Sequence, residues 1–298
     1  LEKTDSELED GKCPIHPNLE IEFIEEENYF FNFSKYQGSL LKLYESNPDF
    51  VIPDFRLAEI KKFVSSGLQD FSISRLKEKM PWGVPVPGDE KHVMFVWFDA
   101  LVNYISTLGW PADRKNFKDF WPGTQIAGKD NLRQQSAMWQ AMLMSAGLPP
   151  SRQIIIHGFI NSNGQKMSKS LGNVINPFEL VEKYGTDAVR FFILHDLQPF
   201  EDSDVTLERI QESYNAHLAN GLGNLVSRVA KLAEKNNIEV YDEELSFNKE
   251  VENKLKDYRF NEASQSIQSL ISDADRKINE TKPWELAGDD AVKVLTDL

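Results

Sequence analysis

Hydrophobic residues change their spacing along the chain and separate a central part from a C-terminal part. In the centre, short apolar runs rich in Val, Ile and aromatic residues lie at 93–98, 125–128 and 153–158. Such runs are typical of strands buried on both faces of a sheet. Helical patterns separate them, at 100–108 and 132–146. This order of strand, helix and strand predicts an α/β fold with a parallel sheet.

After residue 200, apolar residues recur every three or four positions, as they do along one face of an amphipathic helix. This spacing predicts one long helix from Leu207 to Leu232. Apolar residues recur less regularly at 249–280, where we expect further helix. A shorter helical pattern lies at 57–64. The run 81–88 contains three prolines and should be irregular, because proline lacks a backbone donor. We therefore expect a linker or substrate-facing loop there and an all-helical C-terminal third.

The composition, with 41% hydrophobic and 27% charged residues over 298 positions, is that of a globular protein and excludes a disordered or collagen-like chain. No apolar run reaches the roughly 18 residues of a membrane span. The N-terminus lacks a basic stretch followed by an apolar one, so we expect neither a membrane span nor a secretory signal. The single cysteine, Cys13, cannot form an internal disulfide, which predicts a cytoplasmic location.

The net charge of −14 argues at first against a nucleic-acid partner, because affinity for phosphates comes mainly from Lys and Arg. The acidity lies at the two ends: residues 1–50 carry −8 and residues 201–298 carry −9, which leaves +3 for the middle. We therefore expect an anionic substrate to bind the middle part. The chain begins with Leu1, and we expect it to be a piece of a longer protein.

The most specific local feature is the segment Gly164–Asn173, which reads Gly-Gln-Lys-Met-Ser-Lys-Ser-Leu-Gly-Asn. Lys166 and Lys169 are three positions apart and are framed by glycines and hydroxyl residues. Such a loop suits the transfer of a phosphate, where catalysis is chiefly positioning and charge neutralisation. A solvated lysine loop is the alternative interpretation. The next helix should begin with Asn176 as its N-cap and Pro177 in its first turn.

This segment resembles the second catalytic signature of class I aminoacyl-tRNA synthetases. The resemblance implies that Lys166 and Lys169 hold the ATP phosphates while an amino acid is adenylated, and that Lys169 is the main stabiliser of the leaving pyrophosphate. The family also carries a His-Ile-Gly-His signature, which is absent from this chain. We therefore expect the chain alone not to catalyse pyrophosphate exchange.

Further segments resemble methionyl-tRNA synthetases in order and spacing, namely 27–36, 68–75, 81–88 and 96–100. Leucyl, valyl, isoleucyl and cysteinyl enzymes share the lysine loop but not this set. The resemblance implies the second half of a Rossmann-like parallel-sheet catalytic domain followed by an all-α anticodon-binding bundle. Its domains would be the end of a zinc-knuckle insertion at 1–75, the catalytic half at 76–203 and an incomplete helical anticodon-binding domain at 204–298.

The same resemblance implies two sets of binding residues. Aromatic rings are good partners for the polarizable thioether of methionine, although core packing is the alternative for each ring. The implied methionine-binding residues are Trp97, Ala100, Tyr104, Gln135 and Trp139. The implied ATP-binding residues are Gly128, Asp130, His157, Gly158, Lys166, Ser168 and Lys169.

One departure from the family lies next to the Gly-Lys-Asp motif at 128–130. The family usually continues with Ile-Leu-x-Phe-His, whereas this chain reads Asn-Leu-Arg-Gln-Gln. Gln134 and Gln135 thus replace an aromatic residue and a histidine. We expect a reshaped pocket in which Gln135 supplies the hydrogen bond of the missing histidine.

Cys13 and His16 have the spacing of half a metal site, because zinc in structural sites takes four ligands. A cysteine and a histidine without a metal are the alternative interpretation. The resemblance implies that an upstream Cys-x-x-Cys completes this site in one branch of the family. We therefore expect Zn²⁺ in the intact protein and an incomplete site here.

In the helical part, Asn224 and Arg228 are four positions apart and share a helix face. Both side chains can form several hydrogen bonds to base edges. The resemblance assigns them, together with Trp284, to anticodon binding, where an indole can stack on an unpaired base. Solvent-exposed helix residues without a ligand are the alternative.

The resemblance thus implies a methionine–tRNA ligase that uses ATP with Mg²⁺ and charges the 3′ adenosine of tRNA(Met), and we expect no membrane partner. Two other interpretations stay open. One is another class I synthetase of the leucyl, valyl, isoleucyl or cysteinyl type, and the other is a non-catalytic tRNA-binding relative.

Overall fold

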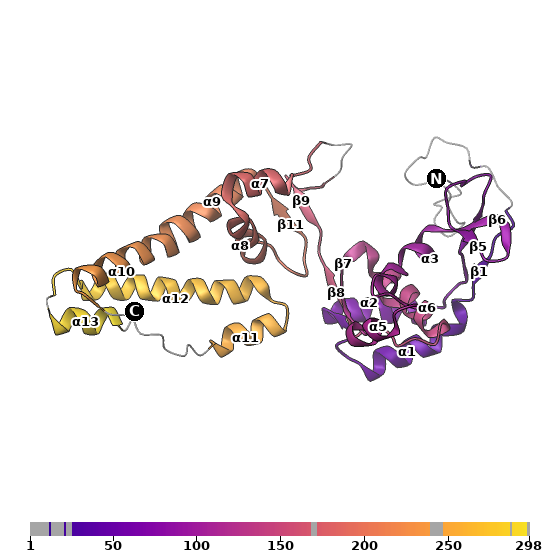
Figure 1. The fold of residues 1–298 in the computed structure, drawn as a ribbon, viewed down its shortest axis with the longest axis horizontal. Helices are drawn as coiled ribbons and strands as arrows, with labels where there is room; N and C mark the ends of the chain where they lie inside the picture. The colour runs from indigo at the N-terminus through magenta and orange to yellow at the C-terminus, as the bar shows by residue number, and fades with distance from the viewer. Residues whose placement is uncertain are drawn as a thin grey trace. The chain divides into compact units, whose positions relative to one another are not determined.

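The computed structural model describes residues 12, 21, 26–167, 172–238, 247–286 and 288–296. The chain divides into two compact units, one formed by residues 1–125 and 133–154 and the other by residues 126–132 and 155–298. Figure 1 shows the helices and strands of both units as a ribbon.

The first unit combines short strands with helices around a core in which Leu40, Tyr44, Ile60 and Ile154 are fully buried. The Tyr44 hydroxyl donates a hydrogen bond of 2.7 Å to the carbonyl of Ser136. Burial raises the pKa of this tyrosine. From residue 30 to residue 157 the elements are β1 (Phe30–Phe31), η2 (Ser34–Tyr36), α1 (Gln37–Ser46), β2 (Val51–Ile52), α2 (Asp54–Ser65), β3 (Phe71–Ser72), β4 (Ser74–Leu76), β5 (Pro85–Val86), β6 (Asp89–Met94), α3 (Val96–Ala100), α4 (Asn103–Ser106), α5 (Arg114–Phe120), β7 (Thr124–Gly128), η3 (Lys129–Asn131), η4 (Gln134–Met138), α6 (Trp139–Ser145) and β8 (Gln153–His157).

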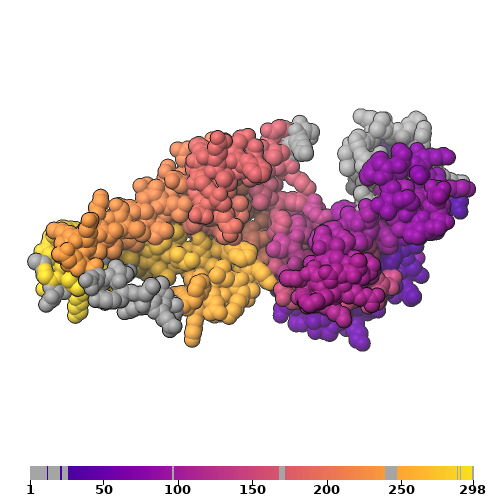
Figure 2. Space-filling model, in the orientation of Figure 1, coloured from indigo at the N-terminus to yellow at the C-terminus, as the bar shows by residue number. Residues whose placement is uncertain are grey.

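The second unit is mostly helical. Its first helices enclose a core that includes Leu180, Val189, Phe192 and Ile210. The remaining elements are β9 (Ile160–Ser162), β10 (Gln165–Lys166), α7 (Pro177–Tyr184), α8 (Thr186–Asp196), β11 (Ser203–Val205), α9 (Leu207–Ser213), η6 (Tyr214–Gly223), α10 (Asn224–Lys235), α11 (Lys249–Lys256), α12 (Phe260–Thr281) and α13 (Asp289–Thr296). The surfaces of α10 and α12, orange and yellow in Figure 2, adjoin.

The strands form small sheets with the orders β2-β8-β7, β4-β6-β5, β1-β3 and β10-β9-β11. β6 is antiparallel to both of its neighbours, whereas β9 is parallel to β11 and antiparallel to β10. The fold is therefore α/β with a small parallel sheet and a helical C-terminal region, which confirms this part of the prediction.

Several predicted elements are present. The runs at 125–128 and 153–158 form β7 and β8, and the pattern at 57–64 lies in α2. The long helix is continuous from α9 through the π-helical η6 to α10. The π-helical segment ends at Gly223, where a Cβ would lie 2.9 Å from the carbonyl oxygen of Leu218, so glycine permits the wider turns.

The prediction of a fully buried strand at 93–98 was wrong. β6 ends at Met94, which pairs with Ser74, the first residue of β4. The Phe95 N–H still donates to the Ile73 carbonyl at 2.8 Å, and the chain then turns into a helix. Phe95 is extended and Val96–Ala100 forms the helix α3. Trp97 thus lies on a helix and not on a strand.

The run 81–88 is not wholly irregular either. Pro85 and Val86 form β5 at the edge of the sheet beside β6, with an irregular register between them. An edge strand tolerates proline because one side of it needs no backbone donor.

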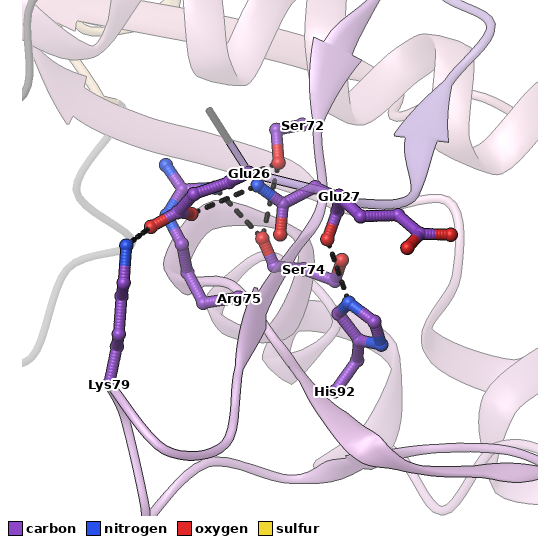
Figure 3. A network of polar contacts seen from close by, with 8 residues as sticks. Glu26, Glu27, Ser72, Ser74, Arg75, Lys79 and His92 are labelled. Atoms are coloured by element: carbon purple, nitrogen blue, oxygen red, sulfur yellow. Dashed lines mark hydrogen bonds and ion pairs between the residues drawn. The ribbon is translucent and has the colours of Figure 1, made fainter. Parts of the chain in front are cut away.

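A polar network joins the segment before β1 to β4 and β6 (Figure 3). The two ring nitrogens of buried His92 lie 2.7 Å from the Glu27 carbonyl oxygen and 2.7 Å from the Asp89 carboxylate. Nearby, the Lys79 ammonium pairs with Glu26. Because both groups facing His92 are acceptors, the protonated ring with two donors fits this position.

The helices of the described ranges are all too short or too polar to cross a lipid bilayer.

Candidate active site

The turn after β7 brings Gly128 close to Asp130 and His157. A Cβ on Gly128 would lie 3.0 Å from the Asp130 carboxylate and 3.7 Å from the His157 ring. A larger residue would therefore crowd the Asp130 carboxylate and fill the space beside the His157 ring. These three residues come from two different strand ends, as expected for a ligand site in an α/β fold.

The His157 ring is oriented by its own neighbour. Its Nδ1 lies 2.7 Å from the carbonyl oxygen of Gly158. A carbonyl only accepts, so Nδ1 carries the proton and, in the neutral ring, Nε2 can accept a hydrogen bond from a ligand. Gly158 itself must be glycine, because a Cβ there would lie 2.0 Å from the carbonyl oxygen of Glu201.

Two ammonium groups share one aromatic ring next to this turn. The Nζ atoms of Lys166 and Lys129 lie 4.1 Å and 4.5 Å from the centroid of Phe159. Lys166 also lies 3.5 Å from Asp130, and Lys129 lies 2.7 Å from Asp202. The Lys166 side chain is 63% exposed, so its charge is accessible to a ligand phosphate.

Sequence reasoning missed Phe159 and Asp202. Phe159 follows the predicted His-Gly strand end directly, which was an available signal. Asp202 is 43 positions from Phe159, and no local pattern links the two.

Several predicted site residues lie outside the described residues. They are Ser168 and Lys169 of the lysine loop and the candidate metal ligands Cys13 and His16. Within the described ranges, no group of three or more His, Cys, Asp and Glu side chains is arranged to hold a metal ion.

Of the residues predicted to bind methionine, three meet in the first unit. The Gln135 side chain donates a 3.0 Å hydrogen bond to the Tyr104 hydroxyl, and the rings of Tyr104 and Trp139 are 6.1 Å apart. The buried indole N–H of Trp139 has no hydrogen-bond partner among the described residues. Trp97 and Ala100 lie on α3, with exposed side chains.

A buried amide network, also missed by sequence reasoning, holds Gln135 in place. Gln125 donates to the Gln135 side-chain oxygen at 3.1 Å, and Gln140 donates to its backbone carbonyl at 2.8 Å. Ser151 links the two outer glutamines by accepting from Gln140 and donating to Gln125. Each glutamine therefore has its amide partly satisfied inside the protein, which fixes the side-chain orientations.

Two of the three residues predicted to bind the anticodon are in contact. The Arg228 guanidinium lies 5.7 Å from the Trp284 ring and pairs with Asp275 and Asn279 of α12 at 2.7 and 2.8 Å. Asn224 is exposed one turn earlier on the same helix. These contacts direct the Arg228 guanidinium toward α12 and the Trp284 ring.

Comparisons with a family profile, with known proteins and with solved structures all identify tRNA synthetases. The profile of the family "tRNA synthetases class I (M)" matches residues 2–230. Two similar proteins are methionine–tRNA ligases. That of Nostoc sp. PCC 7120 is 40% identical over 94% of this chain and 56% of its own length. That of Mesorhizobium japonicum is 50% identical over 72% of this chain and 42% of its own length.

The structure of Mycobacterium tuberculosis methionyl-tRNA synthetase in complex with methionyl-adenylate is also similar, with a TM-score of 0.83 and 36% identity. The match covers 92% of this chain and 57% of that one. The chain spans about half the length of the curated relatives it matches. Because the family profile extends over most of its residues, the chain belongs to the class I tRNA synthetases of the methionine group.

Proposed function

We propose that this chain is part of a methionine–tRNA ligase. In this reaction the methionine carboxylate attacks the α-phosphorus of ATP, so that methionyl-adenylate forms and pyrophosphate leaves. The 3′-terminal adenosine of tRNA(Met) then attacks the carbonyl carbon, and AMP leaves. The observation that carries the proposal is the cluster of Gly128, Asp130, His157 and Lys166 in a chain of this family.

On the ATP side, Gly128 lets the nucleotide approach the backbone, Asp130 contacts it, and His157, next to Gly158, accepts a hydrogen bond from it. Lys166 neutralises phosphate charge, together with Ser168 and Lys169. Mg²⁺, which usually accompanies ATP, would add positive charge at the phosphates. Catalysis here is electrostatic, because charge on the leaving pyrophosphate is stabilised by fixed ammonium groups.

On the methionine side, Tyr104, Gln135 and Trp139 form the wall of the side-chain pocket, and Trp97 and Ala100 complete it. The aromatic rings offer favourable contacts to sulfur. The bound methionyl-adenylate of the mycobacterial structure supports a pocket for this substrate. The amide network around Gln135 takes over the role of the histidine that the family usually has.

We propose the domain limits 1–75 for a zinc-knuckle insertion, 76–203 for the Rossmann-like catalytic half and 204–298 for the anticodon-binding bundle. Asn224, Arg228 and Trp284 would contact the anticodon of tRNA. Cys13 and His16 would be two of four zinc ligands. The protein would act in the cytoplasm.

The test is methionine-dependent ATP–pyrophosphate exchange by the full-length gene product and its Lys166→Ala variant. Loss of a phosphate-binding ammonium should lower kcat by about 10²-fold or more. Lys115→Ala, which removes a lysine that is 88% exposed and pairs only with Asp119 among the described residues, is the matched control and should exchange at the normal rate. Equal rates in all three proteins would contradict the assignment of Lys166.

A further inference from the structure

The hairpin that carries Lys166 is held by the strand β11. β9 pairs antiparallel with β10 and parallel with β11. The turn of the hairpin consists of Asn163 and Gly164, which have positive φ angles of 53° and 73°, as tight two-residue hairpin turns require. The hairpin is therefore compact, and its orientation depends on contacts at its base and its tip.

Two carboxylates provide those contacts. Asp202 and Asp204 are two positions apart, so their side chains lie on the same side of an extended segment. Asp202 accepts the backbone N–H of Phe159 at 2.9 Å, and Asp204 accepts the backbone N–H of Gly164 at 2.7 Å. The N–H of Ser203 donates to the Phe159 carbonyl at 2.9 Å. One carboxylate thus holds the base of the hairpin and the other holds its tip.

Phe159, at the base of the hairpin, also contacts both Lys129 and Lys166. The Phe159 ring lies under the ammonium groups of Lys129 and Lys166, and the Asp202 carboxylate contacts Lys129 as well. Two ammonium groups near one ring repel each other, and the carboxylates of Asp130 and Asp202 offset that repulsion. A shift of Phe159 would therefore move Lys166 away from its contact with Asp130.

We propose that Asp202 and Asp204 are positioning residues for the adenylation step. They act through the backbone of Phe159 and Gly164, and they fix the hairpin so that the Lys166 ammonium faces the ATP phosphates. Hydrogen bonds from N–H groups to a carboxylate are stronger than those to a neutral oxygen, which suits this task. This inference rests on the proposed function.

The kinetic test compares Asp204→Ala with Asp204→Asn in the full-length gene product. The alanine removes the acceptor for the Gly164 N–H, whereas the asparagine keeps an oxygen in the same place. We expect Asp204→Ala to lower kcat of methionine-dependent ATP–pyrophosphate exchange by about ten- to hundredfold, with an unchanged KM for methionine. Asp204→Asn should recover activity to within about threefold of the original protein, because a neutral acceptor restores most of the contact.

The matched control is Glu201→Ala. This substitution removes the same charge at the position next to Asp202. The Glu201 carboxylate forms no hydrogen bond or ion pair with the residues that the structure describes. The kcat of this variant should stay normal. Equal kcat values for Asp204→Ala and Glu201→Ala, or equal losses in Asp204→Ala and Asp204→Asn, would overturn the proposal.

A second measurement does not depend on activity. Amide hydrogen exchange of the segment 158–167 should become faster at Gly164 in Asp204→Ala and at Phe159 in Asp202→Ala. Unchanged exchange at both amides would overturn the role of the carboxylates. If the original protein shows no methionine-dependent pyrophosphate exchange, the proposed function fails, while amide exchange still decides whether these carboxylates hold the hairpin.

Discussion

The side-chain amide of Gln135 donates a hydrogen bond of 3.0 Å to the hydroxyl of Tyr104. The hydroxyl oxygen is therefore engaged as an acceptor, and its proton is left for another group. Since Gln125 fixes the oxygen end of the Gln135 amide, the orientation of Tyr104 depends on an uncharged network. An amide, unlike a histidine, does not titrate near neutral pH.

Replacing Gln135 by Ala should therefore affect methionine more than ATP. We expect the KM for methionine to rise about five- to tenfold, the value of one lost hydrogen bond, while the KM for ATP stays nearly constant. Steady-state pyrophosphate exchange measures both. Gln69→Ala is the control, because Gln69 is exposed. An unchanged methionine KM in Gln135→Ala would remove Gln135 from the pocket.

His92 makes stability depend on pH. Its pKa is raised, first because the Glu27 carbonyl accepts from the ring and then because Asp89 does. Because the pKa is raised on folding, the protonated His92 ring stabilises the folded protein. This stabilisation is fully present below the ordinary pKa of about 6.5 and is lost as pH rises through the pKa of the folded state.

The difference in urea midpoint between the original protein and His92→Gln should therefore shrink as pH rises from about 5.5 to about 9. Other titrating groups are common to both proteins and cancel in the difference. A difference that is constant over this range would show that His92 does not bind a proton on folding.

Two glycines should respond to alanine in opposite ways. At Gly158 the new Cβ would lie 2.0 Å from the Glu201 carbonyl oxygen, so Gly158→Ala should cost about 1–3 kcal/mol or more of unfolding free energy. At Gly38, inside α1, a Cβ meets nothing within 4 Å, and Gly38→Ala should stabilise by about 0.5–1 kcal/mol. Denaturant unfolding measures both, and similar effects at the two sites would contradict the packing described at Gly158.

Arg228 should act on tRNA and not on adenylation. Arg228→Ala removes a guanidinium that Asp275 and Asn279 hold in place. We expect tRNA charging at subsaturating tRNA to fall about tenfold or more, because a good bidentate base contact is worth about 1–3 kcal/mol. Pyrophosphate exchange should be unaffected.

The control for Arg228 is Arg276→Ala, which removes an exposed arginine that pairs with Asp273 within α12. It should charge tRNA normally. If both arginine variants lose charging equally, a general electrostatic effect and not a placed contact would explain the loss.

Local sequence patterns were sufficient to predict the helices and strands whose signals lie within a few residues of one another. α7 is an example: Asn176 accepts from the Phe178 N–H and Pro177 follows it, as the sequence predicted. The helix α3 could not be predicted in this way. Its residues are apolar and aromatic, as in a buried strand, whereas β6 ends where its pairing reaches Ser74, the first residue of β4.

The residues of the candidate site also divide into those that the sequence could predict and those that it could not. The motif residues Gly128, Asp130 and Lys166 could be named from the sequence because each belongs to a short signature. Asp202 and Gln125 could not, because they act through hydrogen bonds to Phe159 and Gln135 across 43 and 10 positions. Side chains that only hold other parts of the chain in place carry no signature of their own.

The most direct test of methionine–tRNA ligase activity is aminoacylation by the full-length gene product. Purified protein, ATP and tRNA(Met) are incubated with labelled methionine, leucine, valine, isoleucine or cysteine, and the label on tRNA is measured. Methionine alone should be attached, and Lys166→Ala should abolish most of the attachment. Attachment of one of the other amino acids, or binding of tRNA without any attachment, would contradict the assignment of this activity.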